Sequence, residues 1–153
     1  MEMKIELTER SSERALAVKK RTDMEGLKDV INEGYALILN HLAELGVQAS
    51  GQPFVAYTGQ GSWEKFDTEM GFTVDRDVPC KGDLYMTKTH GGRAVTGTYK
   101  GSYEGLEKPY DEIYGYIKEN GLEQVGAHYD YYLNDPSVTP ENELLTKIVI
   151  PVK

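Results

Sequence analysis

The sequence has little that would place the chain among secreted or membrane-spanning proteins. It contains one cysteine, Cys80, so no internal disulfide can form, and this suits a reducing cytoplasm. No apolar run approaches the roughly 18 residues that a membrane helix needs. The opening residues MEMKIELTER also lack the apolar core of a signal peptide. We therefore expect a cytoplasmic protein that does not enter a membrane.

Basic residues are also scarce, with 17 Lys and Arg against 25 Asp and Glu and a formal net charge of −8. The one basic run is the KKR of Lys19–Arg21. A protein that binds nucleic acid neutralises phosphates with clustered Lys and Arg. We therefore expect no direct contact with nucleic acid, and an acidic chain attracts cations more readily than anions.

Sequence motifs for metals and cofactors are missing as well. The histidines His41, His90 and His128 are scattered, without a paired His or Cys spacing, which argues against a zinc site. The glycines of TGQGSW lack the Lys-Ser/Thr of a phosphate-binding loop, and no Gly-x-Ser-x-Gly elbow is present. The sequence therefore predicts neither a metal nor a cofactor.

Tyrosine, by contrast, is abundant: the chain has 11 Tyr against 3 Phe and 1 Trp. A core built for stability alone favours Phe and Leu, because a buried phenol needs a hydrogen-bond partner. So many tyrosines fit a surface that is both apolar and polar, such as a ligand pocket. For any single tyrosine, a half-exposed place on a strand is the alternative.

The pattern of apolar residues predicts eight strands and two helices, within a length suited to one domain. The first helix is expected over 24–45, from a capping box at Thr22–Glu25 to a stop at Gly46. The second has a stripe of Leu106, Tyr110, Ile113 and Ile117, with Pro109 in its first turn and Gly121 at its end. Strands are expected around 4–7, 14–21, 53–59, 62–75, 84–90, 92–101, 124–133 and 144–152.

The element order β-β-α-β-β occurs twice, which indicates an internal repeat. Arg14-Ala15 and Arg93-Ala94 are followed at the same spacing by Glu-Gly-Leu, once before each helix. We therefore predict one α+β domain over 1–153, built from two ββαββ-like repeats at approximately 4–76 and 82–153. The repeats would form an antiparallel sheet arrangement with both helices on one face and a central ligand cleft.

The segment AHYDYYLNDP places one carboxylate, Asp130, among tyrosines that read as a strand. A carboxylate buried among rings is costly unless it is paired or hydrogen-bonded. Burial raises its pKa, a bound cation lowers it again, and ring faces attract cations. The pattern therefore predicts a site for an organic cation. The alternative is that Asp130 faces water at a sheet edge.

Strand alternation selects the residues that would line this site together with Asp130. His128 and Tyr132 would share its face, while Tyr129 and Tyr131 would face the helix side. Aromatic residues elsewhere in the chain complete the expected ligand site: Trp63, Tyr57, Tyr85 and Tyr99.

Two segments resemble a known family. GGRAVTGTYKGSYEGL, and YDYYLNDP followed by TKIVIPV, are similar to motifs of the GyrI-like small-molecule-binding domain, the effector-binding part of BmrR-type and some AraC-type transcription regulators. The resemblance covers nearly the whole chain and implies that Asp130 is the acid that meets lipophilic cations. Two residues depart from the family pattern. Asp130 replaces a longer Glu, and Lys147 stands where an acid is frequent and would weaken cation binding if it entered the pocket.

This resemblance implies a stand-alone small-molecule-binding module, an effector sensor or a sequestering protein, since the chain begins directly with its first strand. Two alternatives stay open. Some GyrI-like proteins hydrolyse reactive cyclopropane-bearing natural products, and here Asp130 would be the general acid/base, with His128 or Glu69 as its polar partner. Others inhibit gyrase, which leaves a protein partner open. A haem site, by analogy with the SOUL-type fold, would have only His128 as a strand ligand.

Overall fold

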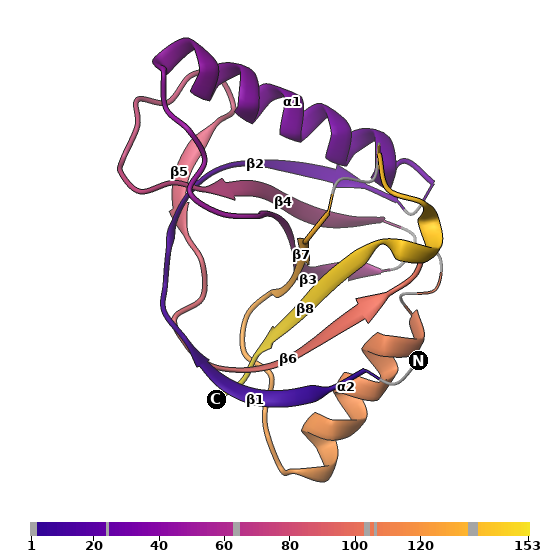
Figure 1. Ribbon diagram of the computed structural model, residues 1–153. Helices are drawn as coiled ribbons and strands as arrows, with labels where there is room; N and C mark the ends of the chain where they lie inside the picture. Colours follow the sequence, from indigo (N-terminus) through magenta and orange to yellow (C-terminus); the bar gives the residue numbers. More distant parts are fainter. Residues whose placement is uncertain (1–2, 24, 63–64, 103–104, 106, 135–137) are drawn as a thin grey trace. The chain divides into compact units, whose positions relative to one another are not determined.

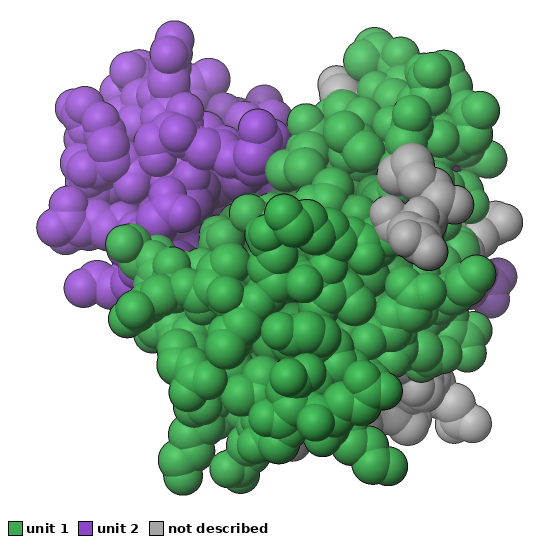
Figure 2. Space-filling model, turned by 60° about the horizontal axis from the view of Figure 1, so that its bottom comes forward, with its two compact units in different colours: residues 1–11, 91–153 green, residues 12–90 purple. Residues whose placement is uncertain are grey.

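The computed structural model describes residues 3–23, 25–62, 65–102, 105, 107–134 and 138–153, and only the backbone of residues 58–62 (Figure 1). Within these residues the chain forms eight β-strands and two α-helices in the predicted order, which confirms the α+β class. The chain divides into two compact units, one of residues 1–11 and 91–153 and one of residues 12–90 (Figure 2).

Unit 1, residues 1–11 and 91–153, is a four-stranded antiparallel sheet covered on one face by a helix. Its strands follow the order β1-β6-β8-β7 across the sheet. A short 3-10 turn at Glu141–Glu143 precedes its last strand. The elements are β1 (Ile5–Arg10), β6 (Gly92–Lys100), α2 (Glu107–Glu119), β7 (His128–Tyr132) and β8 (Leu145–Pro151).

Unit 2, residues 12–90, has the same composition of four antiparallel strands and one helix. Its strands follow the order β3-β4-β2-β5, and the β3–β4 register shifts between Tyr57 and Gly61. Helix α1 crosses β2 and β4 (Figure 1). The elements are β2 (Arg14–Thr22), α1 (Leu27–Leu45), β3 (Pro53–Ser62), β4 (Lys65–Thr73) and β5 (Tyr85–Lys88).

The first strand of each ββαββ segment pairs outside its own segment. Strand β1 pairs with β6, and β5 pairs with β2, both antiparallel. Read from these edge strands, the two units have matching orders, β1-β6-β8-β7 and β5-β2-β4-β3. The compact units therefore do not coincide with the ranges 4–76 and 82–153, and the repeat boundaries remain a prediction.

The predicted C-terminal ends of both helices are confirmed, whereas α1 begins at Leu27, later than the predicted residue 24. Gly46 and Gly121 both have positive φ, 69° and 63°, which glycine adopts without strain. The predicted capping box is wrong. Thr22 is the last residue of β2, where its hydroxyl donates to the Asp23 carbonyl, and the Asp23 carboxylate accepts instead from the Gly26 N–H at 2.8 Å.

The core of unit 1 lies between α2 and the sheet. The inward stripe of α2 supplies Ile113 and Ile117, as its spacing predicts. Alternate residues of β8 and its extension pack against them, because side chains two apart share one face of a strand. The buried cluster is Val95, Ile113, Ile117, Ile148, Ile150 and Val152, with Met3, Ile5, Tyr110, Tyr116 and Leu122 packed around it.

The core of unit 2 lies between α1 and the opposite strands. Ile38 and Leu42 are buried on the inward stripe of α1, and Tyr35 meets the Phe72 ring edge-on at 5.1 Å. Within the described residues, neither α1 nor α2 is long and apolar enough to cross a membrane.

On the sheet face away from α1, the Phe54 ring lies directly over Gly71. A Cβ at position 71 would come within 2.5 Å of Phe54 Cζ and 3.3 Å of the Leu16 carbonyl oxygen. We expect Gly71→Ala to lower the free energy of unfolding by about 1–3 kcal/mol, because overpacking forces neighbouring groups apart.

Gly115→Ala in α2 is the matched control. A Cβ there meets nothing within 4 Å, and alanine favours a helix interior by up to about 1 kcal/mol over glycine. Urea denaturation of both variants measures the difference. Equal stability of the two would contradict the packing described here.

Candidate functional site

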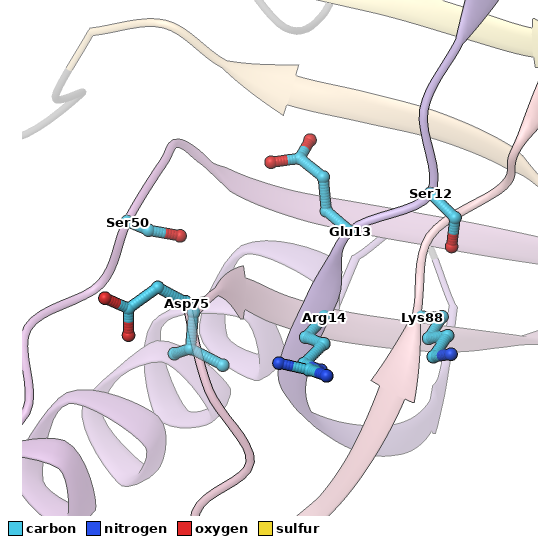
Figure 3. A pocket seen from close by; sticks show the side chains of 7 residues that line it. Ser12, Glu13, Arg14, Ser50, Asp75 and Lys88 are labelled. Carbon is cyan, nitrogen blue, oxygen red and sulfur yellow. The ribbon is translucent and has the colours of Figure 1, made fainter.

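An open pocket of about 440 Å³ lies in unit 2, at the ends of β2 and β5. Figure 3 shows Arg14 and Lys88, which are partners in the antiparallel register, extending to the same side, whereas Glu13 extends away from them. The pocket is lined by Ser12, Glu13, Arg14, Ser50, Val74, Asp75 and Lys88.

None of the site residues predicted from the sequence lines this pocket. Its charged side chains are exposed, and two of them already have ionic partners: Arg14 lies 3.5 Å from Asp77, and Asp75 lies 2.8 Å from Arg76. Exposed charges that are hydrated and already paired contribute little binding free energy to a ligand. The buried carboxylate of unit 1, Asp130, is the stronger candidate.

Asp130 is the buried carboxylate, 1% exposed, in the middle of β7. In the sheet register it lies opposite Ile148, which packs against α2. The prediction that Tyr129 and Tyr131 face the helix is therefore wrong. Asp130 faces α2, because alternation fixes two faces of a strand but does not say which one the helix covers.

Helix α2 provides the groups that surround Asp130. The Tyr110 hydroxyl donates a short hydrogen bond to Asp130 Oδ1. The second oxygen, Oδ2, is buried and has no hydrogen-bond partner among the described residues. Tyr110 also meets the His128 ring edge-on, with 5.2 Å between centroids. The site is thus a carboxylate held by one phenol and flanked by a second ring.

Burial controls the protonation of these groups. It raises the pKa of Asp130 to about 7, although the Tyr110 hydrogen bond opposes the shift. Burial also lowers the pKa of His128 to about 4, so this imidazole is neutral at pH 7 and adds no positive charge. The pKa of Tyr114 is raised mainly by burial; a hydrogen bond with Gln124 opposes this, and the Asp130 charge adds to it.

Two more predicted residues lie in unit 1. Tyr132 is buried on the same face of β7 as Asp130, as alternation predicts. Tyr99, on β6, donates its hydroxyl to the Ser102 carbonyl at 3.0 Å and thereby holds the turn that follows its own strand. The role of both in ligand binding remains a prediction.

The remaining predicted residues belong to unit 2 or lie outside the described residues. Tyr57 is half-buried, with its ring 5.9 Å from that of Phe66. Tyr85 donates a short hydrogen bond to Glu69, and burial, helped by Glu69, raises its pKa. Trp63 lies outside the described residues.

Sequence reasoning missed the residues on α2 that complete the site. The stripe places Tyr110 on the inward face of α2 but does not pair it with Asp130, and no sequence pattern points to Tyr114. The available signal was that Tyr110 is the one hydroxyl in an otherwise aliphatic stripe. A buried phenol needs a partner, and Asp130 is the buried acid on the facing strand.

This arrangement has two chemical capacities. A buried carboxylate with an unpaired oxygen and no cation against it can neutralise a bound cation. A carboxyl with a pKa close to 7 can also give or take a proton at neutral pH.

The sequence from residue 3 to 153 matches the model of the GyrI-like small molecule binding domain. The chain belongs to this family. No curated protein sequence is similar enough to the chain to count as a match.

Solved structures share the GyrI-like fold over nearly the whole chain. The C-terminal domain of EcmrR is 19% identical, with a TM-score of 0.87 over 100% of this chain and 99% of that one. In a complex of EcmrR with DNA, the chain spans 57% of the EcmrR length and 99% of its own, again at 19% identity and a TM-score of 0.87.

Two further solved structures with this fold are described differently, one as a hydrolase and one as a complex with an organic cation. A protein described as a hydrolase encoded by lin2189 from Listeria innocua is 14% identical, with a TM-score of 0.72 over 98% of this chain and 92% of that one. SAV2435, solved with bound tetraphenylphosphonium, is 14% identical, with a TM-score of 0.68 over 98% and 94%.

Titration of Asp130 gives the first test of the site. The folded pKa of about 7 lies above the ordinary value of 3.8, so between these values the folded state keeps a proton that the unfolded state has lost. The free energy of unfolding should then fall as pH rises from 5 to 6.5, by up to about 1.4 kcal/mol per pH unit from this group, and level off above 7.

Asp130→Asn should remove this part of the pH dependence, because an amide accepts from Tyr110 but does not ionise. The exposed Asp111 of α2 provides the control, Asp111→Asn. Urea denaturation at four pH values between 5 and 8 measures all three proteins. Parallel curves for wild type and Asp130→Asn would rule out a buried titrating carboxyl.

Proposed function

We propose that the protein binds a lipophilic organic cation, with Asp130 as the negative partner, and acts as an effector sensor or a sequestering module. One observation carries the proposal: a carboxylate that is 1% exposed has one oxygen without a partner among the described residues. Its neighbours are a phenol and an imidazole that is neutral at pH 7. A bound cation would supply the missing charge.

The surroundings of Asp130 favour an organic cation over a metal ion. Ca²⁺ and Mg²⁺ need about six oxygen ligands, and the described residues around Asp130 offer mainly rings and aliphatic side chains. Aromatic rings attract an organic cation by roughly 0.5–2 kcal/mol each, and more strongly when water is excluded. The family match and the tetraphenylphosphonium bound to SAV2435 support the same class of ligand.

Asp130 is 1% exposed and Tyr110 bonds only Oδ1, so side chains around the carboxylate must move before a cation reaches Oδ2, which has no partner among the described residues. A cation placed there favours the ionised carboxylate, so binding and deprotonation of Asp130 are coupled.

Tetraphenylphosphonium is the probe for this proposal, since its charge does not change with pH. Its affinity for wild type should increase as pH rises from 5.5 to 8, because the carboxylate becomes available as Asp130 ionises near pH 7. Asp130→Asn should bind at least about tenfold more weakly at pH 8, the loss expected for one charge interaction of about 1.4 kcal/mol.

Isothermal titration calorimetry measures both effects, with Asp111→Asn as the matched control. Equal affinity of wild type and Asp130→Asn would refute Asp130 as the charge partner. Affinity that does not change between pH 5.5 and 8 would refute its titration during binding.

Hydrolysis is the second candidate function. It is favoured by the pKa of Asp130, about 7, which suits a general acid or base at neutral pH. A structural relative is described as a hydrolase, at 14% identity. Mass spectrometry of each bound compound after incubation separates the two functions: an intact ligand supports capture, and a hydrated or cleaved product supports catalysis.

A further inference from the structure

The face of unit 1 that lies away from α2 carries two half-buried cationic side chains. Lys147 precedes Ile148 on β8 and therefore points to this opposite face, with Tyr131 of β7 as its register partner. Arg10, at the end of β1, places its guanidinium 5.2 Å from the centroid of the Tyr131 ring. Tyr131 thus has the Arg10 guanidinium above its ring and Lys147 as its neighbour on the adjacent strand.

These two cations have no carboxylate within ion-pair distance among the described residues. Glu6 lies on the same face, but its carboxylate is 2.9 Å from Lys4 Nζ. Burial lowers the pKa of Lys147, the Arg10 charge lowers it further, and Glu6 opposes them. The chain has a net charge of −8, yet Arg10 and Lys147 repel each other on this face. An anion bound between them would relieve this repulsion.

Polar and aromatic groups frame the same cations. Tyr129 and Tyr131 alternate with Asp130 and stack on each other, with 6.2 Å between centroids and 22° between planes. Thr98, the register partner of Lys147 on β6, is exposed on this face. Arg10 is half-exposed, so the face of its guanidinium turned away from Tyr131 can stack on a planar ligand.

We propose that this face of unit 1 binds a planar organic anion, an aromatic carboxylate, between Arg10 and Lys147. The carboxylate would accept from the Lys147 ammonium, in a charge-assisted hydrogen bond that is roughly twice as strong as a neutral one. Its ring would stack on the face of the Arg10 guanidinium that is turned away from Tyr131, continuing the column that begins with Tyr129 and Tyr131.

This site is separate from the one around Asp130. The two groups of residues lie on opposite faces of the same strands, because Lys147 and Tyr131 alternate with Ile148 and Asp130. Their preferred charges are also opposite. The anion site therefore does not depend on the cation proposal, and each can fail alone.

The test compares 2-naphthoate with 2-naphthamide, which keeps the ring and loses the charge, by isothermal titration calorimetry of the full chain at pH 7.5. We expect naphthoate to bind at least about tenfold more tightly than the amide, the ratio expected for one hydrogen bond to a charged group. Lys147→Gln and Arg10→Gln should each lose a similar factor, and higher salt should weaken binding of naphthoate.

Lys118→Gln is the control, since Lys118 is an exposed lysine of α2, in the same unit but on the other side of the sheet. This variant should bind naphthoate as wild type does, and the variant Lys147→Gln should still bind tetraphenylphosphonium if the cation proposal holds. Circular dichroism confirms that each variant is folded.

Three results would overturn the anion site: naphthoate fails to bind, naphthamide binds equally well, or Lys147→Gln and Arg10→Gln leave the affinity unchanged. Competition by inorganic phosphate at the same concentration as naphthoate would overturn the claim that the ring is recognised.

Discussion

A carboxyl group lies in unit 1 on the face of the sheet that otherwise packs aliphatic side chains against a helix. Asp130 is opposite Ile148 in the register and faces α2, so its charge is removed from water. A single phenol, Tyr110, supplies its hydrogen bond, and one oxygen has no partner within the described residues. Because this neighbourhood disfavours the charge, the pKa of Asp130 is raised to about 7. A cation bound against the ionised carboxylate would offset the cost of burying its charge.

The two faces of β7 and β8 have opposite electrostatic character. Toward α2 lies the acid Asp130 with its rings, and away from α2 lie Lys147 and Arg10 beside stacked tyrosines. Alternation of side chains lets one short strand serve both faces. Tyrosine suits both faces, because a ring that carries a hydroxyl can contact aliphatic groups and also satisfy a charge.

Local patterns predicted the order of the elements and the helix ends, because amphipathic spacing and glycine stops act over a few residues. They also singled out Asp130, since a carboxylate in a tyrosine-rich strand contradicts strand propensity. The family resemblance predicted from two motifs agrees with the match over residues 3–153.

The long-range features could not be predicted from such patterns. The pairing of β1 with β6, the contact of Arg10 with Tyr131 and the bond from Tyr110 to Asp130 join residues far apart in sequence. Strand periodicity assigns residues to two faces, but only packing decides which face α2 covers. For that reason Tyr129 and Tyr131 were placed on the wrong side.

The central claim is that Asp130 is a buried carboxyl whose protonation is coupled to binding of a cation. Carbon-13 NMR of the Asp130 side-chain carboxyl, titrated with and without tetraphenylphosphonium, observes this group directly. The structure predicts a midpoint near pH 7 that moves to lower pH when the cation is present. A midpoint at the ordinary value of an exposed aspartate, or one that the cation does not move, would contradict the claim.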